Sequence, residues 1–250
     1  MPGPVDRAIR GLRTAFRNRR QRARFARQFA EFAQLPGAER FPLQWSERLP
    51  RLGEDTPTTG FDRHYVYHPA WAARILRKLD PDVHMDVGSS LFFVSVVSAF
   101  VRTEFYDYRP AELELDGLET GTADLAALPF ADGSIESLSC MHVVEHIGLG
   151  RYGDRLDPNG DLAAMGELQR VLAPGGSLLF VVPVGRPRLR FNGHRIYSRE
   201  QVLAGFPELD LAEFALIPER GSAGWIAGAT AEQVAAQHYG CGCFWFQRRA

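Results

Sequence analysis

The sequence predicts an α/β fold for residues 61–250, with helices on both faces of a mainly parallel sheet. From Phe61 onward, segments with helical spacing of apolar residues alternate with short apolar runs typical of buried strands. One such run ends in Asp86-Val87-Gly88 and leads directly into an apolar helix. A chain of 250 residues with 45% hydrophobic and 24% charged residues is long enough for one such domain with an appendage.

Residues 1–60 are predicted to form this appendage, which consists of a basic amphipathic helix and an irregular connector. Between Ile9 and Ala30, apolar residues recur at three- and four-residue steps, and arginines form a second stripe. Prolines and glycines recur between residues 35 and 60, a composition typical of a connector. Two interpretations of the helix stay open: weak contact of residues 7–32 with an anionic membrane surface, or packing on the core with a solvated basic face.

Composition limits the classes of protein that the sequence fits. The longest nearly apolar stretch, Leu91 to Val101, is about half of the roughly 20 residues that a membrane-spanning helix needs. The arginine-rich start lacks the pattern of a secretory signal, and the three cysteines suggest no disulfide framework. We therefore expect a cytoplasmic, or membrane-peripheral, protein. No basic stripe follows the strand ends of the predicted domain, so no nucleic-acid partner is expected.

The expected elements follow one another from residue 68. Pro69 is expected near the start of the first helix, Asp161 is the expected N-cap of the third, and Ser198 and Gln201 have capping-box spacing for the fourth. The last two strands are expected to pair antiparallel at one edge. The predicted helices cover residues 68–79, 92–101, 161–172 and 199–204, and the predicted strands cover 83–87, 103–107, 118–123, 135–143, 177–182, 211–217 and 243–247.

Polar residues follow the first strands at the points where each one ends. Asp86-Val87-Gly88-Ser89-Ser90 lets backbone N–H groups and a helix N-terminus face a polar ligand, and Gly88 permits close backbone approach. Asp107 lies 21 residues after Asp86, where nucleotide-binding α/β proteins place an acid on the ribose hydroxyls. The two strand ends are therefore expected to meet at one nucleoside.

Further segments occur in a specific order along the chain. They are Thr122-Ala123-Asp124-Leu125, Leu128-Pro129-Phe130-Ala131-Asp132-Gly133-Ser134, Val143-Val144-Glu145-His146 and Leu172-Ala173-Pro174-Gly175-Gly176. With the Asp86 loop they give residues 65–182 a pattern that resembles class I S-adenosylmethionine-dependent methyltransferases. The resemblance implies a Rossmann-like three-layer sandwich, with a mainly parallel seven-stranded sheet and an antiparallel C-terminal edge strand.

The same resemblance implies that the cofactor is S-adenosyl-L-methionine and suggests which residues bind it. Asp86, Gly88, Ser89 and Ser90 would lie along its amino-acid end, Asp107 on its ribose, and Asp124 with Leu125 beside its adenine. His142 is either a further cofactor contact or a packing residue of the fourth strand. Class I enzymes usually carry a second glycine where this chain has Ser90, and the hydroxyls of Ser89 and Ser90 offer hydrogen bonds to a carboxylate instead.

A narrower resemblance lies further along the chain. Glu145-His146-Ile147-Gly148-Leu149-Gly150-Arg151-Tyr152-Gly153-Asp154 and Asn192-Gly193-His194-Arg195-Ile196-Tyr197-Ser198 look like a methyltransferase-like domain family of unknown function. That family is sometimes associated with surface-polysaccharide gene clusters. The family supplies no established substrate and leaves the acceptor open, and our own expectation is a small-molecule or glycan-linked acceptor.

Candidate reacting groups follow the fourth and fifth strands. His146 has an unperturbed pKa suited to accepting a proton from an acceptor, Glu145 would orient it, and His194 is a further catalytic candidate. The alternative for His146 is a structural histidine that orients the loop or the cofactor, and the alternative for Glu145 is cofactor binding. The expected acceptor-binding residues are Arg151, Tyr152, Asn192, Arg195 and Tyr197. The alternative is turn and N-cap chemistry for the loop that begins at Arg151, and a hydrogen-bonded lid without substrate contact for Asn192, His194, Arg195 and Tyr197.

No metal site is expected. The residues from Asp157 to Asp161 lack the glycine and glutamate that a calcium-binding EF-hand loop requires, since leucines occupy those places. His238, Cys241 and Cys243 have no further clear ligand pair near them in sequence.

The sequence thus favours an S-adenosylmethionine-dependent methyltransferase that acts on an oxygen or nitrogen atom. The alternative is a catalytically inactive binding or scaffolding protein of the same fold. A nicotinamide-dependent oxidoreductase is disfavoured because Gly88 is not followed by the remaining glycines of the dinucleotide fingerprint.

Overall fold

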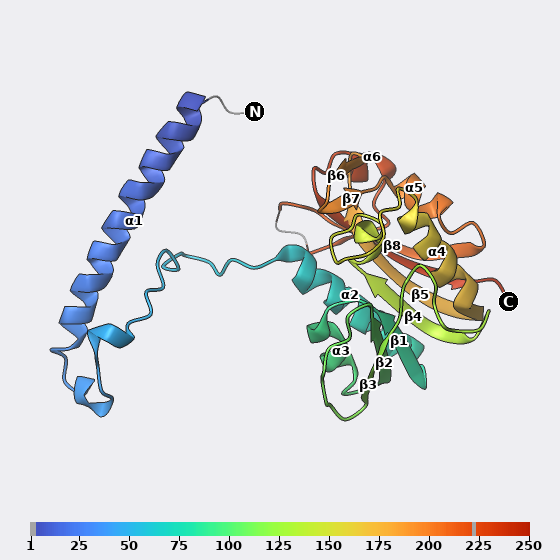
Figure 1. Ribbon diagram of the computed structural model, residues 1–250, viewed down its shortest axis with the longest axis horizontal. Helices are drawn as coiled ribbons and strands as arrows, with labels where there is room; N and C mark the ends of the chain where they lie inside the picture. The colour runs from blue at the N-terminus through green and yellow to red at the C-terminus, as the bar shows by residue number, and fades with distance from the viewer. Residues whose placement is uncertain (1–3, 222–223) are drawn as a thin grey trace. The chain divides into compact units, whose positions relative to one another are not determined.

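A computed structural model describes residues 4–221 and 224–250, with side chains described from residue 15 onward (Figure 1). The chain divides into two compact units, Met1–Gly60 and Phe61–Ala250. None of the helices in the described ranges is long and apolar enough to cross a bilayer.

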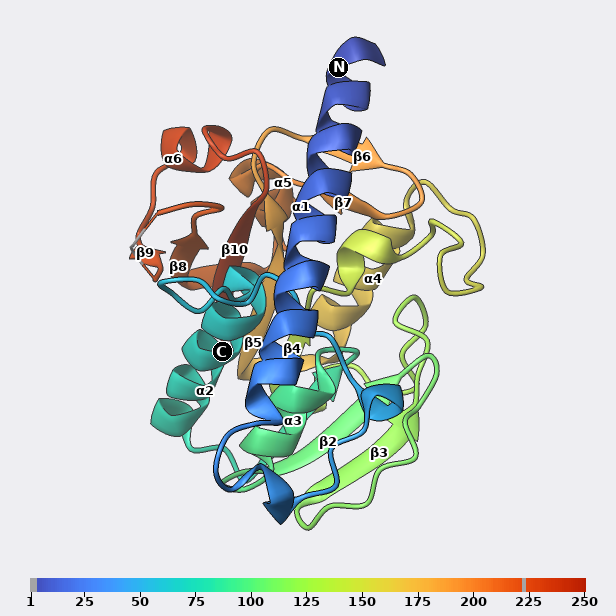
Figure 2. The ribbon, with the colours of Figure 1, turned by 90° about the vertical axis from the view of Figure 1, so that its left-hand side faces the viewer.

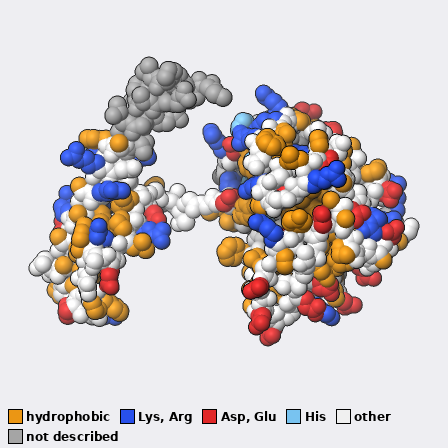
Figure 3. Space-filling view, viewed as in Figure 1, with side chains coloured by type: hydrophobic (Ala, Val, Ile, Leu, Met, Phe, Trp, Pro, Cys, Tyr) orange, Lys and Arg blue, Asp and Glu red, His pale blue; other side chains and the backbone are white. Residues whose placement is uncertain are grey.

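The N-terminal unit is built around one long helix, α1 (Pro4–Phe32), followed by the short 3₁₀ helices η1 (Ala38–Arg40) and η2 (Trp45–Glu47). The connector folds back along α1, because Trp45 packs 5.0 Å from Phe29 and Arg24 pairs with Asp55 at 2.7 Å. Phe16 remains 65% exposed. Figure 3 shows hydrophobic and basic side chains next to one another along the described part of α1.

The second unit contains a mixed sheet with the strand order β3-β2-β1-β4-β5-β10-β8-β9 in its described part. The parallel half comprises β1 (Val83–Val87), β2 (Arg102–Asp107), β3 (Leu118–Thr122), β4 (Ile135–Met141) and β5 (Leu172–Val184). The remaining strands, β8 (Leu209–Ile217), β9 (Ile226–Ala227) and β10 (Gly240–Arg248), pair antiparallel with their neighbours. The predicted fold class is confirmed. The sheet has eight strands rather than seven, and β10 lies between β5 and β8 while β9 forms the edge.

Helices cover both faces of this sheet, as the views in Figures 1 and 2 show for α2 and α4 on opposite sides of β4 and β5. Side chains alternate between the two cores along each strand. Leu179 and Val181 of β5 pack with α2 (Arg63–Leu79) and α3 (Leu91–Val97). Phe180 and Val182 pack with α4 (Gly160–Val171) and α5 (Arg199–Ala204). The remaining elements are η3 (Val144–His146), α6 (Ala231–Ala235) and the hairpin of β6 (Arg188–Arg190) with β7 (His194–Ile196).

Element ends differ from the prediction where side chains cap or pair unexpectedly. Helix α2 begins at Arg63, five residues before the predicted start, because the Asp62 side chain accepts a hydrogen bond from Tyr65 N and caps it. Asp161 is not the N-cap of α4, since Asn159 holds that position and Asp161 instead pairs with Arg195 at 3.4 Å. The predicted capping box of α5 is present.

Candidate functional site

Two adjoining pockets lie at the carboxyl ends of β1, β2 and β4. Both are lined by Gly88, His142, His146 and Tyr152, so together they form one cleft. We call the first the apolar pocket, whose further lining includes Val87, Ala123, Leu125, Val143, Ile147, Asp107 and Asp124. We call the second the polar pocket, whose further lining includes Tyr65, Ser89, Ser90, Glu145, Arg151, His194 and Tyr239.

The loop after β1 is shaped by a buried carboxylate. Asp86 is fully buried, and its Oδ1 accepts a hydrogen bond from Ser89 N at 2.9 Å, while its Oδ2 accepts one from the Ser139 hydroxyl. Burial raises the pKa of Asp86 to about 6. Asp86 lines neither pocket, so it positions the loop rather than forming the expected direct cofactor contact.

The glycine and serines of this loop have separate tasks. Gly88 has a φ of +73°, and a Cβ there would lie 3.0 Å from Val143 Cγ1, so both conformation and space require glycine. The Ser89 hydroxyl accepts a hydrogen bond from Met141 N at 3.0 Å. Ser90 caps α3 by accepting from Phe93 N and has a φ of −73°. A second glycine is therefore not needed at this position.

Two further acids, Asp107 and Asp124, line the apolar pocket. Asp107 Oδ1 accepts from Arg109 N at 2.8 Å, and Asp124 Oδ1 accepts from Ala126 N at 2.9 Å. Each bond fixes a short turn at a strand end and uses only one carboxylate oxygen. Leu125 is buried beside Asp124 and gives this end of the cleft an apolar wall.

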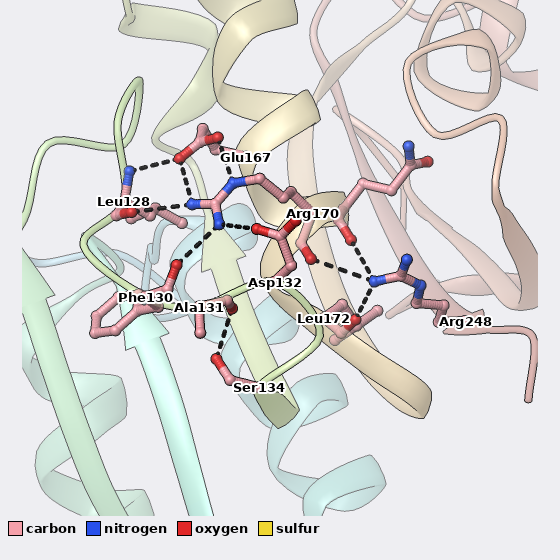
Figure 4. A network of polar contacts seen from close by, with 10 residues as sticks. Leu128, Phe130, Ala131, Asp132, Ser134, Glu167, Arg170, Leu172 and Arg248 are labelled. Atoms are coloured by element: carbon pink, nitrogen blue, oxygen red, sulfur yellow. Dashed lines mark hydrogen bonds and ion pairs between the residues drawn. The ribbon is translucent and has the colours of Figure 1, made fainter.

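An arginine of α4 holds the segment that follows Leu125 (Figure 4). The guanidinium of Arg170 donates to Phe130 O at 2.8 Å and to Leu128 O at 3.0 Å, and it binds Asp132 at 2.6 Å. Glu167 accepts from the same guanidinium and from Leu128 N. Arg170 thereby anchors the loop between β3 and β4 that carries Asp124 and Leu125.

The ring of His146, which follows β4, is held by a backbone carbonyl. His146 Nδ1 lies 2.6 Å from Gly193 O, and because a carbonyl oxygen only accepts, this nitrogen carries the proton. In the neutral ring, Nε2 then holds the lone pair, 3.8 Å from Glu145 Oε1. Glu145 is 1% exposed, and its Oε2 has no partner among the described residues. The pair is arranged for a base and a group that stabilises its protonated form.

His142 lies beside this pair rather than inside the strand. Its backbone has a φ of 60° just after β4, and its Nδ1 lies 3.0 Å from Glu145 Oε1. Its ring stacks on Tyr65 and on His64, at centroid distances of 5.4 Å and 5.5 Å. Burial, followed by the neighbouring His142, lowers the pKa of His64 to about 4.

The loop from Ile147 to Gly160 owes its shape to a second carboxylate. Asp154 accepts hydrogen bonds from the backbone nitrogens of Gly148, Gly150 and Tyr152 at 2.8, 3.2 and 3.1 Å. Burial opposes ionisation of Asp154, but these backbone donors outweigh it and lower its pKa. Asp154 therefore fixes the conformation of the loop that carries Arg151 and Tyr152, which line the polar pocket.

Three of the expected acceptor-binding residues line neither pocket of the cleft. The Arg195 guanidinium donates to Ile147 O at 2.6 Å and to Pro158 O at 3.1 Å, and it pairs with Asp161. The Tyr197 hydroxyl donates to Asp161 at 3.0 Å. Asn192 is exposed, and it lines neither pocket. The expectation of acceptor contacts is corrected for these three residues, because backbone carbonyls and Asp161 use the polar atoms of Arg195 and Tyr197.

The other expected residues do reach the polar pocket. Arg151 and Arg109 both place a guanidinium over the Tyr152 ring, at 4.9 Å and 4.7 Å from its centroid. His194 also lines this pocket, and its buried Nε2 has no partner among the described residues. Burial lowers the pKa of His194.

Two aromatic residues complete the lining of the polar pocket, and one of them, Tyr239, was not predicted from the sequence. Tyr65 comes from the first turn of α2, and Tyr239 immediately precedes β10, so nearly the whole domain separates them in sequence. Burial raises the pKa of Tyr239 to about 12. No local pattern marks Tyr239 as a site residue, because it is placed by the pairing of β10 with β5.

Solved methyltransferase structures share this fold. A protein of Bacillus halodurans assigned as a methyltransferase is 15% identical, with a TM-score of 0.53, covering 73% of this chain and 99% of its own. The N-methyltransferase NodS of Bradyrhizobium japonicum, in complex with S-adenosylhomocysteine, is 14% identical, with a TM-score of 0.51 and coverage of 79% and 90%. The 1,6-didemethyltoxoflavin-N1-methyltransferase of Burkholderia thailandensis, also with bound S-adenosylhomocysteine, is 11% identical, with a TM-score of 0.51 and coverage of 73% and 79%.

These likenesses show that the chain has the fold of class I methyltransferases. Residues 131–211 match the model of a family described as Caenorhabditis protein of unknown function, DUF268. That segment contains β4, η3, α4 and β5, which supply one side of the cleft. No curated protein matches the chain.

Proposed function

We propose that this protein is an S-adenosylmethionine-dependent methyltransferase that acts on an oxygen or nitrogen of a small or glycan-linked acceptor. The observation that carries the proposal is the division of one cleft into an apolar pocket and a polar pocket. Asp107, Asp124 and Leu125 line the first, and the second contains His146 and Glu145. Gly88 is one of the four residues that line both pockets.

The residues of the cleft fit the proposed cofactor. Carboxylate oxygens of Asp107 suit the two ribose hydroxyls, and Leu125 suits the apolar face of adenine. Gly88 lines both pockets, and Ser89 and Ser90 line the polar one. When bound there, the cofactor would supply a methyl group on a sulfonium, and the acceptor atom would attack that methyl carbon in line while the sulfur leaves as a thioether.

The acceptor would occupy the polar pocket, where its proton has a nearby destination. His146 Nε2 holds a lone pair because Nδ1 donates to Gly193 O, so it can take the proton of a hydroxyl or ammonium group. Glu145 would stabilise the imidazolium that results, since its Oε1 lies 3.8 Å from Nε2. Tyr152, held between two guanidinium groups, would cover the junction of the pockets and limit access of water.

The cofactor step is tested by calorimetry of ligand-free protein with S-adenosylhomocysteine. No binding at millimolar ligand would refute the proposal. Mass spectrometry of ligands retained through native purification would test the same step without a chosen ligand.

The catalytic step is tested with His146→Ala, once a methylated acceptor is found by screening. Loss of a general base is expected to reduce turnover by about 10²- to 10⁴-fold while S-adenosylhomocysteine binding persists. His238→Ala is the matched control, because His238 is exposed and lines neither pocket. Cofactor binding without transfer to any acceptor would favour the inactive binding protein instead.

A further inference from the structure

A cluster of possible metal ligands lies beside the polar pocket. His64 in the first turn of α2, His142 just after β4 and Cys241 at the start of β10 are all buried. Each offers one ligand atom, and the three atoms lie within 4.8 Å of one another. Residues so far apart in sequence converge here only because β10 enters the middle of the sheet.

The geometry of one edge of this cluster matches that of zinc. Cys241 Sγ lies 3.5 Å from His142 Nε2. Zinc–sulfur and zinc–nitrogen bonds of about 2.3 and 2.0–2.1 Å at a tetrahedral angle would place the same two atoms about 3.6 Å apart. This edge therefore needs almost no rearrangement to accept the ion.

The ring of His142 is already oriented as a ligand, whereas the ring of His64, which stacks on it at 13° from parallel, must turn to direct a lone pair at the same ion. His142 Nδ1 donates to Glu145 Oε1 at 3.0 Å, which leaves the lone pair of Nε2 directed at Cys241. A histidine whose far nitrogen is held by a carboxylate is the usual arrangement around zinc. Glu145 thus fixes the ring of His142 and leaves its other nitrogen for a ligand bond.

Unpartnered polar atoms surround the cluster. His68 is fully buried and its Nδ1 lies 2.6 Å from His64 O, so its Nε2 carries a lone pair that has no partner among the described residues. Its ring lies 5.0 Å from that of His142. Glu145 Oε2 is likewise buried without a partner. Within the described ranges, Glu145 forms ion pairs only with histidines, so nothing with a permanent positive charge offsets its buried carboxylate.

We propose that His64, His142 and Cys241 bind a zinc ion at the edge of the polar pocket, with Glu145 as the group that orients His142. The set of two imidazoles and one thiolate suits zinc better than calcium or magnesium, which prefer oxygen ligands. Three protein ligands leave a fourth coordination position for a water molecule or a ligand atom. The ion's charge would also offset the buried carboxylate of Glu145.

A catalytic cysteine is the other arrangement that these contacts resemble. The side-chain contacts run from Cys241 to His142 and from His142 to Glu145, as they do between a nucleophile, its base and the carboxylate that orients the base. A nucleophile must reach its substrate, whereas Cys241 is 0% exposed and lines neither pocket. The burial of its sulfur therefore favours metal binding.

The test uses the full chain, made with zinc in the growth medium, and measures metal by plasma emission spectrometry. One zinc per chain is the expected result. After removal of the metal with a chelator, titration with cobalt(II) is expected to produce the near-ultraviolet absorption of a cobalt–thiolate bond. A wild-type protein that retains no zinc and gives no such absorption would overturn the proposal, whatever the variants do.

Paired variants identify the ligands. Cys241→Ser is expected to abolish the cobalt–thiolate absorption. Cys243→Ser is the matched control, because Cys243 Sγ lies 4.0 Å from Cys241 Sγ but does not belong to the group of three ligand atoms. Equal loss in both variants would overturn the assigned ligands. Glu145→Gln is expected to weaken metal binding by about 10- to 100-fold, the usual effect of losing a group that orients a ligand.

A check on folding accompanies each variant. Near-ultraviolet circular dichroism and S-adenosylhomocysteine binding report on the fold and the cleft without the metal. Zinc binding in a protein that does not bind S-adenosylhomocysteine would remove the proposed function and leave the metal site in place.

Discussion

Replacing Asp86 with asparagine removes a carboxylate from the interior of the protein and preserves its shape. Asparagine Oδ1 can still accept from Ser89 N, and its amide can donate to the Ser139 oxygen. The Ser139 hydroxyl can then donate to His84 Nε2, which lies 2.9 Å away. Burial lowers the pKa of His84 to about 3, so its ring is neutral and can accept this hydrogen bond.

The pKa of Asp86 determines both the size and the sign of the effect. The pKa is about 6 in the folded protein against 3.8 for a solvent-exposed aspartate, so folding favours the protonated carboxyl. The stability linked to this group is complete below the unfolded pKa and is lost as the pH rises through about 6. At about 1.4 kcal/mol for each pH unit, the full loss is about 3 kcal/mol, of which roughly half develops between about pH 5 and pH 8.

The assay compares urea unfolding of the wild type and Asp86→Asn at a series of pH values. The stability of the variant relative to the wild type should increase by about 1.5 kcal/mol between about pH 5 and pH 8. Any constant cost of the buried amide appears at every pH and does not change this slope. Ser139→Ala removes a hydrogen bond that stabilises the ionised form of Asp86. The variant should therefore raise the pKa of Asp86, and its loss of stability should continue to higher pH than in the wild type.

Parallel stability curves for the wild type and Asp86→Asn would refute the reasoning, since they would mean that the carboxyl titrates alike in both states. A variant that loses stability as the pH rises, relative to the wild type, would mean that the folded protein favours the ionised form.

Other predictions concern the cleft and the appendage. Asp107→Ala should weaken S-adenosylhomocysteine binding by about 10- to 100-fold in calorimetry, since hydrogen bonds to a charged group contribute about 1.5–3 kcal/mol, and unchanged affinity would remove Asp107 from the site. Arg170→Ala should lower the free energy of unfolding by about 2–3 kcal/mol, because two backbone carbonyls and two carboxylates lose their donor. Arg249→Ala is its control, because its exposed pair with Asp210 should contribute under about 1 kcal/mol, and equal losses in urea unfolding would contradict the anchoring role of Arg170. The full chain should co-sediment with anionic vesicles in a salt-sensitive way and a chain starting at Leu35 should not, whereas equal sedimentation of the two would count against membrane contact by residues 7–32.

Most of the helices and strands could be predicted because their signals depend on residues only a few positions apart in the chain. Alternating apolar runs placed the strands, and the pair of Ser198 and Gln201 correctly marked the start of α5. The expected meeting of Gly88 and Asp107 at one pocket followed from the rule that parallel strands end at the same edge of a sheet, whereas Asp124 was placed there by the resemblance to class I methyltransferases. Neither inference needed the order of all the strands.

Side-chain direction and long-range pairing could not be read in the same way. Arg195 has the chemistry of an anion-binding residue, but its nearest acceptors are carbonyls of a loop about 40 residues earlier in the chain. In the sequence, the possible metal ligands nearest to Cys241 are His238 and Cys243. Its structural neighbours, His64 and His142, are 177 and 99 positions away in the chain, and only the sheet order brings them to it.

The central position of β10 also constrains how the domain folds. Residues 240–248 follow every other strand in the chain, yet β5 and β8 both depend on them for hydrogen bonds. During synthesis, β5 and β8 leave the ribosome before β10 has been made, so the backbone groups that will pair with β10 are still unpaired. A premature stop before Gly240 would remove only a small part of the length but would leave two strands available for pairing with other chains. Quality control of this protein is therefore expected to be most sensitive to lesions in its last strand.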